Sequence, residues 1–133
     1  MLSPECMREL KSSWLPNVTD AGLDRLIDLL EKGSPMLIHG SFTRSVPMGC
    51  LATQIAWHHP QTEKMTLDAG ICWLNRVAGL NPATSLVIRE WDRSAECDFE
   101  IRQDLAAAFR LERDERRQLV DETVGADEEL VTV

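Results

Sequence analysis

The stretch GCLATQIAWHHP, residues 49–60, contains a cysteine, a tryptophan and two adjacent histidines. Thiols and imidazoles are preferred zinc ligands, and a Cys–His pair can also form a nucleophilic site. If residues 47–59 form a helix, however, Cys50 and His59 point about 180° apart, and Cys50 lies roughly 12 Å along the axis from His58. Neither pair can then hold one metal ion. The stretch therefore predicts a central, mostly buried helix.

The histidines have a simpler expected role. His58 and His59 come at the end of this predicted helix, just before Pro60, where an imidazole can hydrogen-bond unpaired carbonyl groups and interact favourably with the helix dipole. His39 lies in the loop sequence HGSFTRS, which is typical of a turn but could also line a pocket. No cofactor is expected. A metal site stays an alternative in which folding brings the three histidines together.

Cys72 is the second position at which chemistry is conceivable. In the sequence LDAGICWLNRVAG the apolar side of the predicted helix is formed by Leu67, Ile71, Leu74 and Ala78. Asp68, Cys72 and Arg76 stack on the other side at i, i+4 and i+8. Arg76 favours a thiolate, whereas Asp68 opposes it, and no neighbouring histidine can act as a base. We expect a small residue at a helix contact, with a reactive thiol as the alternative.

A third pattern concerns nucleic acid. Residues 74–91, LNRVAGLNPATSLVIREW, resemble the helix-turn-helix of bacterial DNA-binding proteins in the turn AGLNPAT. Asn75 replaces the small residue of that pattern, and Ser85 replaces an apolar one. The outward positions of the second helix would be Leu86, Val87 and Glu90. They offer no suitable donor to base edges and add a negative charge near phosphates, so DNA binding through residues 74–93 is only a further alternative.

The elements that position these residues are predicted to be helices. Ser3 and Pro4 form an N-cap and first-turn pair for a short helix that ends before Pro16. Thr19 or Asp20 caps the clearest amphipathic helix, GLDRLIDLLEKG, which Gly33 ends. Its apolar positions, spaced i, i+3, i+4 and i+7, are Leu23, Leu26, Ile27 and Leu30.

Four more helices are expected, over residues 47–59, 64–78 and 82–93 and from Phe99 onward, the last of them capped by Asp98. Its shared apolar face consists of Ile101, Leu105, Ala108 and Phe109, and the charged run LERDERRQ continues it into solvent. Residues 34–47 read as a long loop with a brief extended piece at 36–39. Residues 85–91 could instead form a strand, but the preceding Asn-Pro pair favours a helix.

Size and charge favour a single cytoplasmic domain. A chain of 133 residues with 44% hydrophobic residues can bury a core without disulfides or a metal, so residues 1–122 are expected to form one all-α bundle of five or six helices. Residues 1–95 hold 10 acidic and 9 basic residues, whereas residues 96–133 hold 12 and 5, so the net charge of −8 belongs mainly to the C-terminal part. Residues 123–133 are therefore predicted to be a disordered, flexible acidic tail.

The cysteines and the hydropathy support the same location. Cys6, Cys50, Cys72 and Cys97 are irregularly spaced, as reduced thiols usually are. The N-terminal residues do not resemble a signal peptide, and no apolar run approaches the roughly 20 residues of a membrane span. We therefore expect a cytoplasmic protein that does not bind membranes.

Catalytic motifs are not found in the sequence: there is no glycine-rich phosphate loop, no G-x-S-x-G and no H-E-x-x-H. The leading hypothesis is thus a non-enzymatic interaction or regulatory protein that binds a protein partner or itself. The four tryptophans Trp14, Trp57, Trp73 and Trp91 are expected to be core residues, although one at a surface edge would suit a partner contact. The alternatives are the Cys/His site and DNA binding described above.

The order of features also resembles a group of small bacterial helical proteins of unknown function. The matching residues are Cys50 and Leu51 at the start of a buried helix, Trp91 and Asp92 at a helix end, and a closing amphipathic helix over residues 99–109. The resemblance covers roughly residues 20–110. It implies a helical fold and no assigned activity.

Overall fold

The computed structural model describes residues 2–94 and 99–131, with side chains described as far as Asp121. The α-helices of these residues are α1 (Pro4–Glu9), α2 (Asp20–Lys32), α3 (Leu51–Ala56), α4 (Ala69–Cys72), α5 (Leu86–Arg93) and α6 (Phe99–Val131). They are joined by two π-helical segments and one short 3₁₀ helix: η1 (Leu10–Trp14), η3 (Trp73–Ala78) and η2 (Leu15–Asn17). The predicted all-α fold of five or six helices is confirmed.

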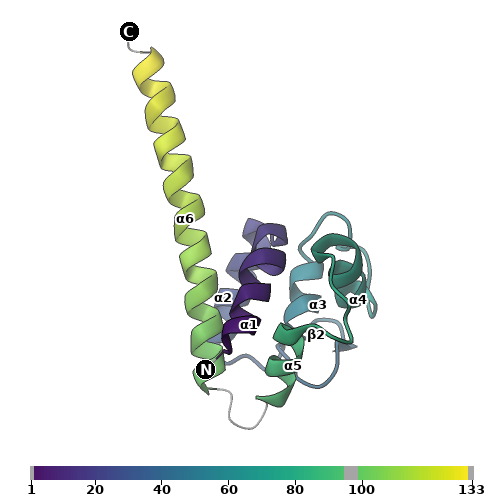
Figure 1. Cartoon of the computed structure of the whole chain (residues 1–133). Helices are drawn as coiled ribbons and strands as arrows, with labels where there is room; N and C mark the ends of the chain where they lie inside the picture. The colour runs from purple at the N-terminus through teal and green to yellow at the C-terminus, as the bar shows by residue number, and fades with distance from the viewer. Residues whose placement is uncertain (1, 95–98, 132–133) are drawn as a thin grey trace.

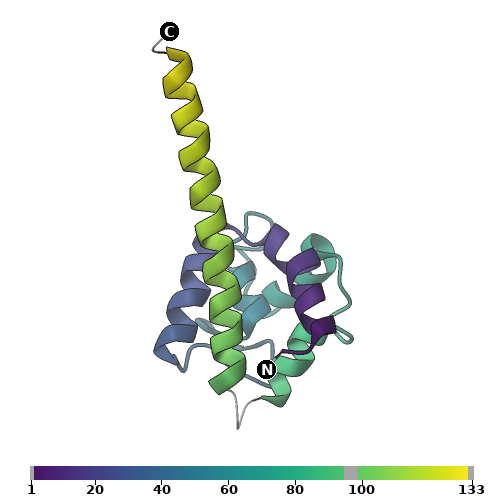
Figure 2. The ribbon, with the colours of Figure 1, turned by 60° about the vertical axis from the view of Figure 1, so that its left-hand side comes forward.

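Helix α6 lies along one side of the molecule and projects well beyond the other helices (Figure 1). In this view α1 and α2 lie between α6 and the remaining elements, and after rotation α6 crosses in front of the other helices, with α2 on one side of it and α1 on the other (Figure 2). α6 packs mainly against α2, and the two helices run antiparallel, because Arg110 pairs with Glu31 whereas Arg116 pairs with Asp20. We call the compact part formed by residues 2–94 and the first half of α6 the body.

The first two helices begin where their local signals predicted, and the second also ends there. Ser3 caps α1 by accepting a hydrogen bond from the Cys6 amide, and Pro4 is the first helical residue. The chain then continues through η1 and η2 past the expected stop at Pro16. Thr19 caps α2, and Gly33 ends it in the left-handed conformation, with φ of 60°.

The third helix is shorter than predicted, because residues 47–50 belong to a hairpin. Strands β1 (Thr43–Ser45) and β2 (Met48–Gly49) pair antiparallel, with Thr43 opposite Gly49. The Gly49 amide donates to the Met36 carbonyl and the Cys50 amide donates to the Phe42 carbonyl, so these backbone groups are already committed to the loop. The predicted extended piece at 36–39 is present as a parallel bridge between Leu37 and Gly49.

The buried Gln54 side chain holds this loop on α3. Its amide nitrogen donates to the carbonyl oxygens of Met36 and Pro47, each at 2.9 Å. All six residues of α3 are buried, which confirms a central, buried helix. Its first residue is Leu51, however, so the predicted start at residue 47 was wrong.

The fourth helix also begins later than predicted, at Ala69 instead of residue 64. The Thr62 hydroxyl donates to the Ala56 carbonyl at 2.7 Å, and the Met65 amide donates to the Thr62 carbonyl, so the residues after α3 form successive turns. Leu67, predicted to face the core, is 57% exposed. Leu74 is buried as predicted, and the rest of the buried side of α4 and η3 is formed by Ala69, Gly70 and Trp73.

The fifth helix begins at Leu86, four residues after the predicted start. The Asn81 side chain accepts a hydrogen bond from the Ala83 amide, which is the local turn that competes with helix formation after an Asn-Pro pair. Ser85 then caps α5 by accepting from the Ile88 amide. Residues 86–91 are helical, so the alternative of a strand is excluded.

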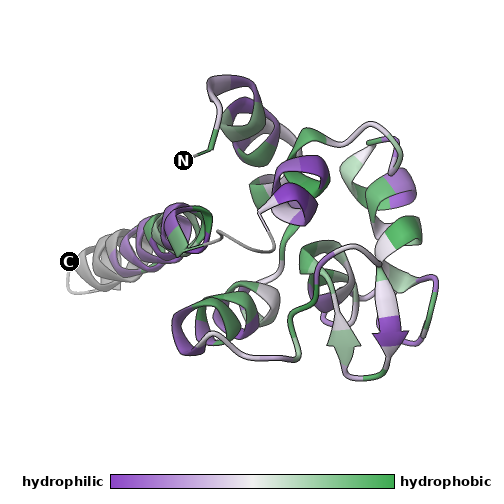
Figure 3. Ribbon diagram, turned by 90° about the horizontal axis from the view of Figure 1, so that it is seen from below, coloured by the Kyte–Doolittle hydropathy of each residue, from purple (hydrophilic) through white to green (hydrophobic). Residues whose placement is uncertain are grey.

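A single hydrophobic core joins these elements. Trp14, Trp73 and Trp91 are fully buried, as predicted, and the rings of Trp14 and Trp73 meet edge to face with centroids 5.3 Å apart. Leu105 and Phe109 bring α6 into the same core. In Figure 3 the helices of the body carry hydrophobic and hydrophilic residues on different sides, as expected for amphipathic helices round a shared core.

Helix α6 begins at Phe99 as expected, whereas its proposed cap, Asp98, lies outside the described residues. The helix continues to Val131, through most of the segment that was expected to be disordered. The flexibility of residues 123–133 stays a prediction. Among the described residues, no helix combines the length and the apolar character needed to cross a membrane.

Candidate functional site

The histidine of the loop, His39, forms part of a contact between that loop and α5. Its ring stacks on Trp91, with centroids 3.9 Å apart and planes inclined by 17°. The Trp91 indole donates to the Ile38 carbonyl at 2.8 Å, and Asp92 accepts from the Gly40 amide at 2.8 Å. The guanidinium of Arg102 lies 5.3 Å from the Trp91 ring centroid. His39 thus helps to hold the loop against α5.

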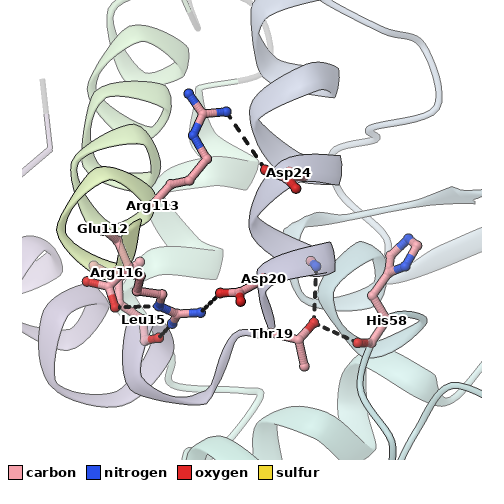
Figure 4. Close-up of polar contacts among 9 residues, drawn as sticks. Leu15, Thr19, Asp20, Asp24, His58, Glu112, Arg113 and Arg116 are labelled. Atoms are coloured by element: carbon pink, nitrogen blue, oxygen red, sulfur yellow. Dashed lines mark hydrogen bonds and ion pairs between the residues drawn. The ribbon is translucent and has the colours of Figure 1, made fainter. Parts of the chain in front are cut away.

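The other two histidines follow α3 and have different partners. The His58 carbonyl accepts a 2.7 Å hydrogen bond from the Thr19 hydroxyl, which ties the end of α3 to the start of α2 (Figure 4). The His59 ring accepts from the Gln61 amide at 3.1 Å, so it caps the following turn, not the helix carbonyls that were expected. Within the described residues, no group of three or more His, Cys, Asp or Glu side chains is placed to hold a metal ion.

Two of the thiols are unsuited to nucleophilic chemistry. Burial raises the pKa of Cys50 to about 11, although the contact of its Sγ with the Thr53 hydroxyl, 3.7 Å away, acts in the opposite direction. Burial also raises the pKa of Cys6, and a hydrogen bond with Glu90 adds to this effect. Because the thiolate is the reactive form, both side chains are inert thiols near neutral pH.

Cys72 is the most accessible of the described thiols, because it is half-buried whereas Cys6 and Cys50 are buried. Its amide donates to the Asp68 carbonyl at 3.0 Å, so Asp68 precedes the first turn of α4 and is not stacked within a longer helix. Arg76 belongs to the π-helical η3, whose wider turn breaks the i, i+4, i+8 stack that was predicted. Reactivity of Cys72 stays a prediction.

A pair of glutamates that the sequence did not single out ties α1 to α5. The Glu9 carboxylate accepts from the amides of Leu86 and Val87, at 2.9 and 3.1 Å. It also accepts from the Ser85 hydroxyl at 2.7 Å and from the Trp14 indole at 3.1 Å. Conversely, Glu90 of α5 accepts from the Ser3 amide and hydroxyl at the start of α1. Each carboxylate stabilises the positive end of the other helix.

This arrangement counts against DNA binding. Val87 is buried and Glu90 contacts Ser3, so the predicted outward positions of α5 were wrong, and the exposed positions include Arg89 and Arg93 instead. The first turn of α5, which would approach DNA in a helix-turn-helix, has the Glu9 carboxylate on its amides. A negative charge at that place repels phosphates.

The outer half of the contact between α2 and α6 is polar (Figure 4). Arg116 pairs with Asp20 and with Glu112, both at 3.0 Å, and donates to the Leu15 carbonyl at 2.8 Å. The Arg113 guanidinium lies 3.8 Å from Asp24. These ion pairs hold α6 against α2 as far as Arg116. Beyond Arg116, α6 extends away from the body.

Two large apolar side chains are exposed just past that point. Leu119 is 63% exposed and Val120 is 61% exposed. At about 100° per residue, both lie within roughly 60° of the direction of Leu105, which is fully buried in the core. The face of α6 that packs on the body therefore continues as an uncovered face. We call residues 117–131 the arm and take it as the candidate functional site.

Trp57 is the one tryptophan of the four that is only half-buried, which makes it the surface-edge tryptophan that the sequence allowed for. It caps the end of α3, where its amide donates to the Thr53 carbonyl. Its ring packs close to Gly49, at 3.3 Å from where a Cβ would stand. Trp57 therefore serves mainly to close the hairpin on α3.

Comparison with known proteins adds no relative. No family model matches the chain, and no curated protein or solved structure matches it. The resemblance to small bacterial helical proteins therefore stays a prediction, and the fold and the arm are what characterise this protein: an α-helical body from which one long helix extends.

Proposed function

We propose that the protein is a non-enzymatic interaction protein that binds a protein partner through the arm of α6. The observation that carries this proposal is the exposure of Leu119 and Val120 on the continuation of the core-facing side of α6. Contact between such side chains and a partner removes apolar surface from water, at about 25 cal/mol per Å². A helix whose packing face extends past its own domain is suited to bind a second surface.

The chemistry-bearing side chains of the body support a role without catalysis. Glu9 and Glu90 are engaged in capping, His39 is stacked on Trp91, and Cys50 is a buried thiol. These groups are used to build the fold. The free thiols Cys6, Cys50 and Cys72 also suit a reducing compartment, which supports the cytoplasmic location that we propose with this function.

The proposal is tested by capture from a lysate of the source organism with tagged full-length protein. The informative variant is Leu119→Ser/Val120→Ser, and the matched control is Val46→Ser/Leu67→Ser, which removes two side chains that are 57% exposed on the body. We expect the wild type and the control to capture the same proteins, including untagged copies of this chain, and the arm variant to lose them. Identical capture by all three proteins contradicts the proposal.

A further inference from the structure

The base of the arm carries charges as well as apolar side chains. A shallow depression where α6 leaves α2 is lined by Asp20, Asp24, Arg113, Arg116, Arg117, Val120 and Asp121. Two of its arginines are already engaged: Arg113 lies beside Asp24, and Arg116 is paired with Asp20. Arg117 and Asp121 are exposed, and neither has an ion-pair partner among the described residues. This leaves one basic and one acidic group next to Val120.

Arg117 and Asp121 are poorly arranged to form an ion pair with each other. They are four residues apart on α6, but in the order base before acid, which is the less favourable orientation for an i, i+4 pair. On the helix both point to the side of the exposed Val120, within about 100° of it, whereas Leu119 points to the opposite side. A surface with this pattern is completed by one that offers an acid opposite Arg117 and a base opposite Asp121.

A second copy of the same helix offers that pattern when it runs antiparallel. About a two-fold axis at residue 119, position 117 of one copy faces position 121 of the other, and the reverse contact is repeated by symmetry. Two Arg117–Asp121 pairs then flank Val120 of each copy. A parallel arrangement instead places Arg117 against Arg117 and Asp121 against Asp121, which is repulsive.

The sequence continues this complementarity along one side of the helix. At spacings of three or four residues, Arg110 and Arg113 precede Arg117, and Val124 and Glu128 follow Asp121. About the same axis, position 110 is opposite position 128. Together with positions 117 and 121, this is a second basic position set against an acidic one, whereas position 113 is opposite Gly125.

We propose that the base of the arm, residues 117–121, pairs antiparallel with the same segment of a second copy of this chain, through Val120 and reciprocal contacts between Arg117 and Asp121. This inference rests on the proposed function, because it names the partner of the same arm. In this register the two arms overlap directly only at residues 117–121, so the contact lies at the small end of specific interfaces and the dimer is weak. Self-association therefore depends on concentration.

The test is sedimentation equilibrium of the full chain, with single, double and mixed charge variants. Arg117→Asp and Asp121→Arg each replace two attractive contacts by two repulsive ones, and we expect dimerisation to weaken on the order of tenfold or more. The double variant Arg117→Asp/Asp121→Arg restores the attraction, and an equimolar mixture of the two single variants forms a heterodimer. Arg76→Asp, at an exposed arginine of η3, is the control and keeps wild-type dimerisation.

A wild type that is monomeric at every concentration overturns the inference, as do single variants that dimerise like the wild type or a mixture that stays monomeric. These failures are distinct from failure of the proposed function. If the chain is monomeric while Leu119→Ser/Val120→Ser still abolishes capture of another protein, the arm binds a different partner. If that variant alters neither capture nor dimerisation, both proposals fail.

Discussion

The body and the arm use their side chains in opposite ways. In the body, polar groups that could do chemistry are engaged in hydrogen bonds: Glu9 accepts three from the start of α5 and one from Trp14, and Gln54 holds the loop on α3. In the arm, Leu119 and Val120 are exposed and Arg117 has no ion-pair partner among the described residues. The difference indicates that the body serves as a scaffold and that the arm makes the contacts outside it.

The largest effect is expected from truncation of a core aromatic residue. Trp73→Ala removes a fully buried indole that packs on Trp14, and we expect the free energy of unfolding to fall by about 3–5 kcal/mol. Phe99→Ala, at an α6 side chain that is 71% exposed, is the control and should change it by less than about 0.5 kcal/mol. Urea denaturation measures both. Equal losses of stability in the two variants would contradict the view that Trp73 belongs to the core and Phe99 does not.

A smaller loss of stability is expected when the hydrogen bonds between Glu9 of α1 and the start of α5 are removed. Glu9→Ala leaves the Ser85 hydroxyl and the amides of Leu86 and Val87 without their acceptor, which should cost about 2–3 kcal/mol. Glu5→Ala, at an exposed glutamate of the same helix, is the matched control. If both variants unfold at the same urea concentration, the Glu9 carboxylate contributes little to the stability of the body.

The burial of Cys50 predicts a loss of stability at alkaline pH. Its pKa is raised from 9.0 in the unfolded chain to about 11, so the unfolded state releases a proton first and the free energy of unfolding declines between these values. The contribution is about 3 kcal/mol. In Cys50→Ala, unfolding measured from pH 8 to 11 should show a shallower decline. A decline as steep as that of the wild type would mean that this thiol titrates as it does in water.

The smallest effects are expected along the polar contact between α2 and α6. Arg116→Ala removes two ion pairs and a hydrogen bond to the Leu15 carbonyl, for about 1 kcal/mol, because the side chain is only 26% exposed. Arg110→Ala removes one pair with Glu31, in which both partners are more exposed, for a few tenths of a kcal/mol. Thermal unfolding at low and high salt measures the loss of stability in each of the two variants. A larger loss for Arg110→Ala would reverse the expected order.

The elements that could be predicted from sequence are those whose signals are local. The caps Ser3 and Thr19 and the left-handed Gly33 lie within a few residues of the groups they satisfy, so the start of α1 and both ends of α2 were predicted correctly. The starts of α3 and α5 depend on distant partners, namely the Met36 carbonyl for Gly49 and the Glu9 carboxylate for Leu86. Those partners are 13 and 77 residues away, and propensity does not reveal them.

For the candidate sites, the type of a residue predicted its role less well than its position in the fold. The Cys and His residues that attracted attention are held by local contacts, as with His39 on Trp91 and His59 with the Gln61 amide. From the sequence, residues 117 and 118 of the arm were interpreted as part of a solvated continuation of α6, and its residues from 123 onward as part of a disordered tail. The available signal was Leu119 and Val120 directly after the charged run LERDERRQ, at the spacing of the buried Leu105 and Phe109. Where the body ends along α6 could not be known without the fold.

Amide hydrogen exchange, followed along α6 by NMR as the protein is concentrated, tests the contrast between body and arm most directly. The account predicts that protection of Leu105 and Phe109 in the body stays constant, whereas protection around Arg117–Asp121 rises with concentration as the arm becomes covered. Arm amides whose protection equals that of the body and does not change with concentration would contradict an arm that is built for contacts outside its own fold.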